Sequence, residues 1–186
     1  MFLTTSLLVT LTALVIERLA GYPRWLYARI GHPVEWFGRL IARADDRFNR
    51  PNASPSRSRA AGLATIVLLL AAGATATAVV LVFLRPAPYG WLIEALLAAP
   101  FLAQSELQRF VTRVADGLDT SLAAGRQAVS HIVGRDPAEL DEAGVARAAI
   151  ESLAENTSDG IVAPAFWLAI AGLPGIVAYK IVNTAD

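Results

Sequence analysis

The chain has 186 residues, of which 55% are hydrophobic and only 17% are charged. Soluble globular proteins average about 45–50% apolar and about 25% charged residues, so this composition favours a membrane protein. Sixteen basic residues balance sixteen acidic ones, which argues against a nucleic-acid-binding protein, and the lack of cysteine excludes disulfides and thiolate metal sites.

Two uncharged segments in the first half of the chain predict membrane-spanning helices. Residues 1–16 lack the basic start and the small-residue cleavage site of a signal peptide, so we interpret them as a first span. Residues 62–84 carry no charge. As a helix they would extend about 34 Å, enough to cross a hydrocarbon core of about 30 Å.

Two further apolar segments, 89–107 and 161–182, predict a third and a fourth span. Glu94 lies inside the third, where it is either a carboxylate that reaches the interface or an intramembrane polar site. Helix-breaking residues in the fourth predict a broken or kinked helix, of the kind that lines protein or water rather than lipid. They are Pro164, Gly172, Pro174 and Gly175. We therefore expect an all-α, polytopic helical membrane protein that forms a single membrane domain over residues 1–186.

The loops predict the orientation of these spans. Residues 17–60 contain nine arginines and four carboxylates, so the positive-inside rule places them in the cytoplasm. The second span then leads out of the cytoplasm and the third leads back, which places the polar segment 106–160 there as well. Within the first loop, residues 33–50 put apolar side chains on one helical face and arginines on another. This pattern fits an amphipathic interfacial helix or an anion-binding face, and His32 before it fits a structural or a functional role.

The second polar segment contains a run of carboxylates next to the fourth span. Asp136 fits a helix N-cap, and the alanine-rich run predicts a helix over 141–156. Glu151 and Glu155, four residues apart, share a face of that helix, and Asp159 follows in a predicted turn. These three side chains fit a solvated helix end, a site for a hard cation such as Mg²⁺, or a general base.

Two stretches resemble a known family. "AVSHIVGRDPAELDEAGVARAAIESLAENTSDGIVAPAFWLAIAGLPG", followed by "YKIVNTAD", is similar to the CobD/CbiB family of cobalamin biosynthesis, the adenosylcobinamide-phosphate synthases. "HPVEWFGRLI" at 32–41 resembles the family's early His-Pro-Val and Gly-Arg-Leu-Ile region. The Asp-Pro pair that usually precedes His-Pro-Val is absent. Family members also continue past the Asn-Thr-x-Asp motif in which this chain stops, so we expect an N-terminal portion.

The resemblance implies a multi-pass protein of the inner (cytoplasmic) membrane with its polar site facing the cytoplasm. It implies a C–N bond-forming ligase that joins aminopropanol, or its O-phosphate, to the free propionate of adenosylcobyric acid. ATP and Mg²⁺ would drive the step. The implied partners are the corrinoid, the amine, the lipid bilayer and other cobalamin-assembly enzymes.

Residue chemistry then suggests roles within the matching motifs. We expect catalysis to involve Glu155, Asp159 and Asn156, and metal binding to involve Glu151, Glu155 and Asp159. Substrate-binding candidates are His32, Arg126, Arg135, Ser158 and Asn183. Two other functions are weighed: a non-catalytic membrane regulator or assembly subunit similar to the AmpE-type relatives, and a corrinoid or cobalt transport component.

Overall fold

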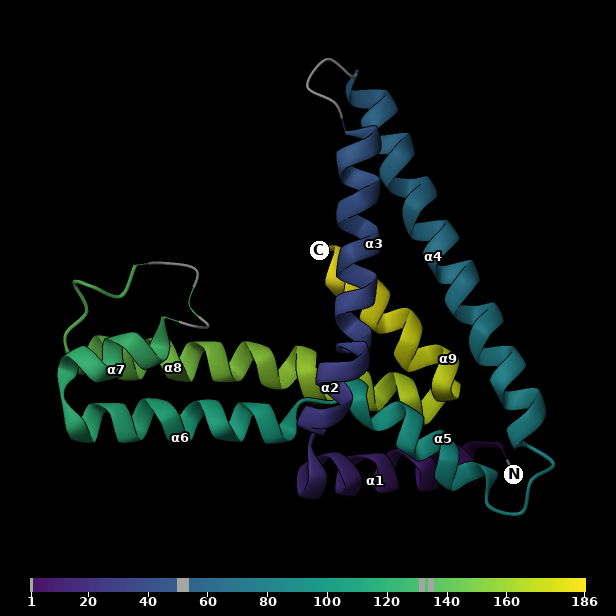
Figure 1. Cartoon of the computed structure of the whole chain (residues 1–186), viewed down its shortest axis with the longest axis horizontal. Coiled ribbons are helices and arrows are strands. Elements are labelled where there is room, and N and C mark those ends of the chain that lie inside the picture. The colour runs from purple at the N-terminus through teal and green to yellow at the C-terminus, as the bar shows by residue number, and fades with distance from the viewer. Residues whose placement is uncertain (1, 50–53, 131–132, 134–135) are drawn as a thin grey trace. The chain divides into compact units, whose positions relative to one another are not determined.

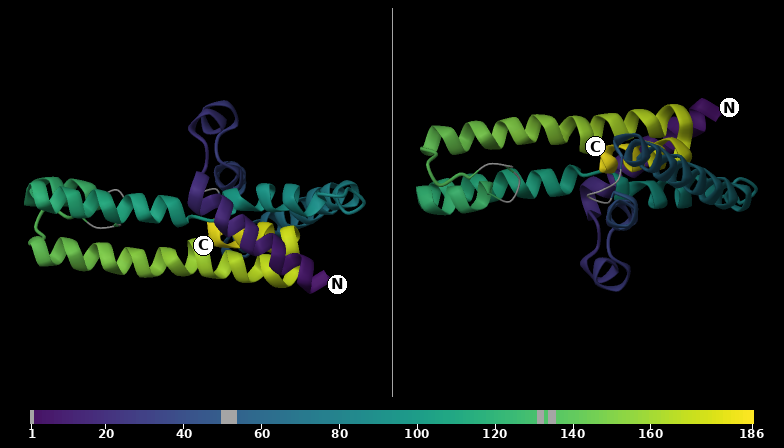
Figure 2. Two further views of the ribbon diagram at one scale, coloured as in Figure 1. Left: turned by 90° about the horizontal axis from the view of Figure 1, so that it is seen from below. Right: turned by 90° about the horizontal axis from the view of Figure 1, so that it is seen from above.

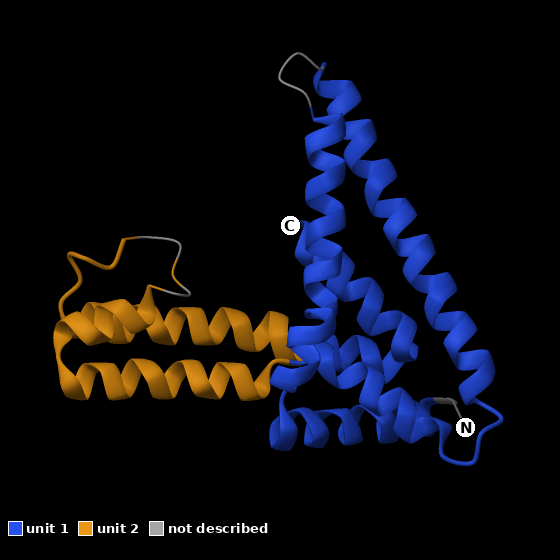
Figure 3. Cartoon of the chain, in the orientation of Figure 1, with its two compact units in different colours: residues 1–102, 163–186 blue, residues 103–162 orange. Residues whose placement is uncertain are grey.

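The computed structural model describes residues 2–49, 54–130, 133 and 136–186, and none of these residues lies in a β-strand. The prediction of an all-α protein is therefore confirmed. The chain divides into two compact units, residues 1–102 with 163–186 (unit 1) and residues 103–162 (unit 2), which Figure 3 distinguishes. The single membrane domain over residues 1–186 expected from the sequence stays a prediction. The boundaries of unit 2 fall within three residues of the polar segment predicted at 106–160.

Unit 1 contains the long apolar helices. Its elements are α1 (Phe2–Ala20), α2 (Arg24–Ile30), α3 (Pro33–Phe48), α4 (Pro55–Leu84), α5 (Gly90–Ala98), the 3-10 turn η1 (Ala99–Phe101) and α9 (Ala163–Ala185). Three helical stretches in the described part of the chain are long and apolar enough to cross a membrane: Leu3–Ala20, Pro55–Leu84 and a window within Glu142–Ala185. They correspond to the first, second and fourth predicted spans.

Helix α9 is the centre of unit 1, since it packs against α1, α3, α4 and α5 (Figures 1 and 2). The core around it includes Val9 and Ala13 of α1 and Leu168, Ile176 and Ile181 of α9. The helix is kinked at Gly172, whose φ of 65° and ψ of −157° are not helical. Pro174 follows two residues later and cannot donate a backbone hydrogen bond. The predicted break in the fourth span is confirmed.

The third predicted span, 89–107, is wrong as a single helix. Helix α5 has only nine residues, and the chain then forms η1 and becomes extended at Leu102, with φ −104° and ψ 156°. Nine helical residues rise about 14 Å, too little to cross the hydrocarbon core. Pro100, inside the apolar run, removes a backbone donor where the helix ends. The cytoplasmic location of 106–160 depended on this crossing, so it stays a prediction.

Unit 2 is a small helical assembly of α6 (Gln104–Thr120), α7 (Leu122–Val129), α8 (Glu142–Thr157) and the π-helical turn η2 (Ser158–Val162). Helix α6 packs against both α7 and α8. Its period of three to four residues turns Leu107, Phe110 and Val114 inward, as the sequence predicted. Phe110 and Val114 join Val129 and Val145 in a core of their own. Unit 2 thus has its own hydrophobic core.

Candidate functional site

Most of the predicted site residues lie on α8 and η2 in unit 2. Asp141 begins α8, and its Oδ1 accepts a hydrogen bond of 2.7 Å from the backbone N–H of Gly144. A carboxylate N-cap both satisfies a free amide and complements the helix dipole. The N-cap expected at Asp136 is therefore wrong, because Asp136 instead accepts from the N–H of Ala138 in the preceding turn. The helix then runs through the alanine-rich stretch as predicted.

The predicted turn at Asp159 is instead a π-helical turn. Residues Ser158–Val162 keep the chain helical but widen it. Pro164 explains the position, because a proline in an α-helix lacks the N–H that would bond the carbonyl four residues earlier and its ring clashes with that carbonyl. Gly160 allows a close approach within unit 2, where a Cβ would lie 3.1 Å from the Cβ of Ala103. Such π turns occur frequently at functional sites.

The three carboxylates do not converge as expected. Glu151 and Glu155 are exposed on α8, whereas Asp159 is half-buried in η2. Among the described residues, no group of three or more His, Asp or Glu side chains is arranged to hold a metal ion. Glu151 and Glu155 lie one turn apart on α8 and share a helical face, as predicted.

Three other predicted residues of unit 2 have different surroundings. The Nδ2 of Asn156 donates to the carbonyl of Ser152 at 2.8 Å, so its amide is turned back along the helix. The Nε of Arg126 donates to the carbonyl of Leu140 at 2.7 Å and ties α7 to the residues before α8. Ser158 is exposed in η2. Arg135 lies outside the described residues.

A second polar group surrounds His32 in unit 1, at the start of α3. The Nδ1 of His32 accepts from the backbone N–H of Val34 at 3.3 Å, and the backbone N–H of His32 donates to the Oε2 of Glu35 at 3.5 Å. The Oη of Tyr27 donates to the Oε1 of Glu35 at 2.7 Å, and Arg39 lies 3.6 Å from the same carboxylate. His32 and Glu35 therefore form a reciprocal capping box at the start of α3. Pro33 occupies the first helical position, where no backbone donor is needed.

These contacts favour a neutral imidazole at His32. Burial lowers the pKa of His32, the charge of Glu35 raises it, and the charge of Lys180 lowers it further. The hydrogen bond from Tyr27 lowers the pKa of Glu35, which keeps that carboxylate ionised. Since Nδ1 is an acceptor, the proton of the neutral ring is assigned to Nε2. His32 can then donate one hydrogen bond to an anionic group.

Sequence reasoning missed Lys180 as a site residue. It lies on α9, is only 8% exposed, and acts electrostatically on His32. The end of α9 packs against α3, where a Cβ at Gly38 would lie 3.7 Å from the Cγ2 of Thr184. Asn183 is half-buried on the same turn. Unit 1 therefore joins the "HPV" and "YKIVNTAD" motifs, which the sequence separates by about 150 residues. The missed signal is that Lys180 is the only charged residue in 161–182.

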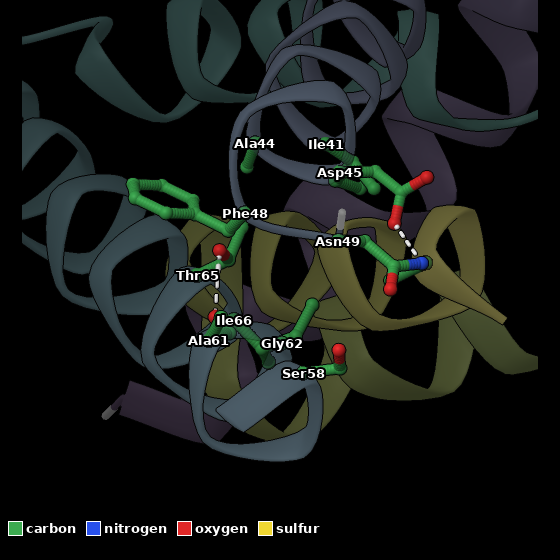
Figure 4. A pocket seen from close by; sticks show the side chains of 11 residues that line it. Ile41, Ala44, Asp45, Phe48, Asn49, Ser58, Ala61, Gly62, Thr65 and Ile66 are labelled. Carbon is green, nitrogen blue, oxygen red and sulfur yellow. Dashed lines mark hydrogen bonds between the residues drawn. The ribbon is translucent and has the colours of Figure 1, made fainter. Parts of the chain in front are cut away.

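Two cavities lie in unit 1. The smaller, of about 270 Å³, lies between α3 and α4 and has a mainly apolar lining (Figure 4). Its polar groups are partly engaged, since Asn49 donates to Asp45 at 3.0 Å and Thr65 donates to the carbonyl of Ala61. The larger, of about 620 Å³, is lined by Glu94 and Gly172 among others. Only the larger reaches the range of about 300–1,000 Å³ that is usual for small-molecule sites.

The two motifs that meet in unit 1 and the polar segment of unit 2 can be compared with known proteins. Residues 10–186 match the family model described as CobD/Cbib protein. The chain belongs to the CobD/CbiB family. This confirms the family resemblance found in the sequence, and the match spans both units.

Curated members of the CobD/CbiB family are similar to the chain over nearly its whole length. A protein of Sinorhizobium sp, named Cobalamin biosynthesis protein CobD, is 53% identical over 184 residues, which are 98% of this chain and 57% of the relative. The protein of the same name from Rhizobium meliloti (strain 1021) is 52% identical over 182 residues, covering 97% and 56%. That from Rhodobacter capsulatus is 47% identical over 178 residues, covering 94% and 55%.

The chain spans about half the length of the curated CobD relatives it matches. No solved structure matches it. Family membership therefore rests on sequence.

Proposed function

We propose that the protein containing this chain is a ligase of cobalamin biosynthesis. It joins the amine of aminopropanol, or of its O-phosphate, to the free propionate of adenosylcobyric acid at the expense of ATP. Membership of the CobD/CbiB family supports this proposal, as does the name of the relatives. The observation that carries it within the chain is the acidic face of α8, which leads directly into the π-helical turn η2.

The chemistry requires the groups that this segment offers. A carboxylate and an ammonium do not condense in water, so one propionate oxygen first attacks the terminal phosphorus of ATP and ADP leaves. The amine nitrogen then attacks the acyl carbon, phosphate leaves, and a base removes the extra proton from nitrogen. We assign that base to Glu155, which is exposed on α8 and separated by one helical turn from Glu151.

Magnesium and ATP belong to the proposal. Magnesium is commonly held by one or two carboxylates together with phosphate oxygens, so Glu151 and Glu155 fit it without a third protein carboxylate. When bound, the ion would supply charge neutralisation at the phosphates. In unit 1, His32 and Asn183 would donate hydrogen bonds to anionic or amide groups of the corrinoid. Independently of unit 1, Arg126, Ser158 and Arg135 of the polar segment are proposed to bind anionic or amide groups of a substrate.

Replacing one charge on α8 tests this proposal. In the full-length protein, Glu155→Gln keeps the size and the helix but removes the base and a magnesium ligand. We expect amide formation to fall by about 10²-fold or more, the usual loss for a general base. We also expect ATP with magnesium to raise the melting temperature of the wild type but not of the variant.

The matched control is Glu142→Gln, another exposed glutamate, in the first turn of the same helix. It should keep wild-type turnover and protection. Wild-type turnover by Glu155→Gln would refute the assignment of the base. Absence of turnover in the wild type, with all substrates supplied, would favour the regulator or transport function instead.

A further inference from the structure

Glu94 is the only charged residue of α5, and the proposed ligase chemistry gives it no role. Its side chain contacts a helix that lies far away in the sequence. The Oε1 of Glu94 accepts a hydrogen bond of 3.3 Å from the backbone N–H of Leu173 in α9. A Cβ on Gly172 would lie 3.4 Å from the same oxygen. The carboxyl group on α5 therefore lies against the kink of α9.

This hydrogen bond involves the first residue of the second arm of α9, residues 173–185. Gly172 interrupts the helix, and the first amides of a helical segment have no acceptor within that segment. Leu173 is only 4% exposed, so its N–H would be buried and unpaired without an acceptor from elsewhere. Pro174, the next residue, has no N–H to satisfy. Glu94 thus caps the second arm from another helix.

The larger cavity of unit 1 lies beside this kink. Its lining includes Glu94 together with Ala171, Gly172 and Pro174, and its volume is about 620 Å³. Close packing normally fixes the angle between two helical segments, but a cavity at the kink leaves the two arms of α9 room to change that angle. At this wall, the hydrogen bond from Leu173 to Glu94 ties the second arm to α5.

The second arm carries the polar residues of the "YKIVNTAD" motif. Lys180 is 8% exposed and acts electrostatically on His32, and Asn183 follows it by one turn. The same arm packs against α3, which His32 begins. The arm is about 18 Å long, so a change of about 10° at the kink would move its far end by about 3 Å. The angle at the kink therefore determines where these side chains lie relative to α3.

We propose that Glu94 is a positioning residue, which holds the second arm of α9 at the angle that presents Lys180 and Asn183 next to α3. The acceptor oxygen of Glu94 carries this role, and its charge does not. This inference rests on the proposed ligase function, because that function gives His32 and Asn183 their corrinoid substrate. The alternative is that buried contacts of the arm, such as those of Ile176 and other apolar residues, hold it unaided.

Two variants of the full-length protein separate the hydrogen bond from the charge. Glu94→Gln keeps an oxygen that accepts from Leu173, whereas Glu94→Ala leaves that N–H unpaired. If the arm in Glu94→Ala holds the competent angle about a tenth of the time, the KM for the corrinoid rises about tenfold. The kcat should change by less than about twofold, because saturating corrinoid selects the competent angle. A merely structural loss would instead lower kcat through a smaller folded fraction and leave KM unchanged.

A cross-link reports the position of the arm without turnover. A Cβ on Gly38 of α3 would lie 3.7 Å from the Cγ2 of Thr184 near the end of the arm, which brings the two positions within reach of a disulfide. Residues 1–186 contain no cysteine, and any cysteine elsewhere in the full-length protein is first replaced by serine. The pair Gly38→Cys and Thr184→Cys should cross-link about tenfold more slowly with Glu94→Ala than with Glu94 or Glu94→Gln.

The cross-link also provides a rescue and the test has a matched control. Once formed in Glu94→Ala, the disulfide should return the KM to that of the cross-linked protein with Glu94, because it restores the angle of the arm. Asp46→Ala removes an exposed carboxylate of α3 that lines neither cavity. It should leave KM, kcat and the cross-linking rate as in the wild type.

Each outcome decides the proposal. A raised KM and slow cross-linking in Glu94→Ala, both restored in Glu94→Gln, support it. Equal cross-linking rates in Glu94→Ala and wild type overturn it, as does a fall in kcat at unchanged KM. An equal loss of turnover in Glu94→Gln and Glu94→Ala also overturns it, because the charge of Glu94 would then be required. A wild type without turnover refutes the proposed ligase function instead, while the cross-linking rates still decide whether Glu94 holds the arm.

Discussion

The kink at Gly172 gives a quantitative prediction. Its φ of 65° with ψ of −157° lies in a region of backbone conformation that is essentially restricted to glycine, where another residue costs about 1–3 kcal/mol. Gly172→Ala adds that cost to the folded state. It also lowers the conformational entropy of the unfolded chain, which offsets about 0.4–1 kcal/mol of the loss. The added Cβ would sit 3.4 Å from Glu94, an ordinary contact, so no clash is added. The net expected loss is about 1 kcal/mol.

A loss of this size is measurable as a melting shift. For a protein of about 150–250 residues it corresponds to a fall of about 2–4 °C in the melting temperature, and for a protein about twice as long to roughly half of that. A suitable assay is thermal unfolding of the full-length protein in one detergent, followed by circular dichroism at 222 nm. Gly172→Asn should lose about as much as Gly172→Ala, because asparagine tolerates the left-handed helical region but not a positive φ combined with a ψ of −157°.

Gly62→Ala is the matched control, since Gly62 lies inside α4 and nothing lies within 4 Å of an added Cβ. This change should raise stability by about 0.5–1 kcal/mol, as alanine does in helices. If Gly172→Ala also raised stability, or if asparagine were clearly tolerated better than alanine, α9 would not be kinked in the conformation that favours glycine and the reasoning above would fail.

Two further predictions concern the pH response and the orientation. Because burial lowers the pKa of His32, the unfolded chain takes up a proton at this residue before the folded chain does as pH falls through about 6.5. Stability should therefore be fully present above that pH and decline below it, and His32→Asn, which keeps a capping acceptor, should flatten the decline. An unchanged pH slope in His32→Asn would contradict the buried neutral imidazole. For orientation, Ser56→Cys should resist an impermeant thiol reagent in intact cells, because the positive-inside rule places residues 17–60 in the cytoplasm. Residues 1–186 contain no other cysteine that could react. Ser121→Cys, exposed in unit 2, should resist it too if the cytoplasmic location of 106–160 holds. Labelling of Ser121→Cys alone would show that the short α5 does not return the chain across the membrane.

The sequence predicted the long apolar helices well, because an uncharged run of sufficient length has few alternatives to a helix in lipid. It failed at 89–107, since average hydropathy does not reveal where the backbone stops being helical. Pro100 and the extended Leu102 make that break. Both Asp136 and Asp141 fitted an N-cap, but only Asp141 begins a helix. Local capping patterns can thus be satisfied by a turn as well as by a helix.

The functional residues were harder to predict, because their grouping depends on tertiary contacts. His32 could be judged only once α3 and α9 were seen to pack together, which brings Lys180 within electrostatic reach. Conversely, Glu151, Glu155 and Asp159 look grouped in the sequence, yet the described residues contain no group of three such side chains arranged to hold a metal ion. Proximity in sequence was therefore a poor guide to a shared metal site.

The π turn at Ser158–Val162 has a consequence for any periodic scan of this region. A π turn contains more residues than an α turn, and each residue of an α-helix advances by about 100°. A helical wheel drawn from α8 into α9 without a correction therefore loses phase at residue 158. A scan that substitutes every fourth position would follow one stripe before that residue and a different stripe after it. Mutational periodicity should be interpreted separately on the two sides of the turn.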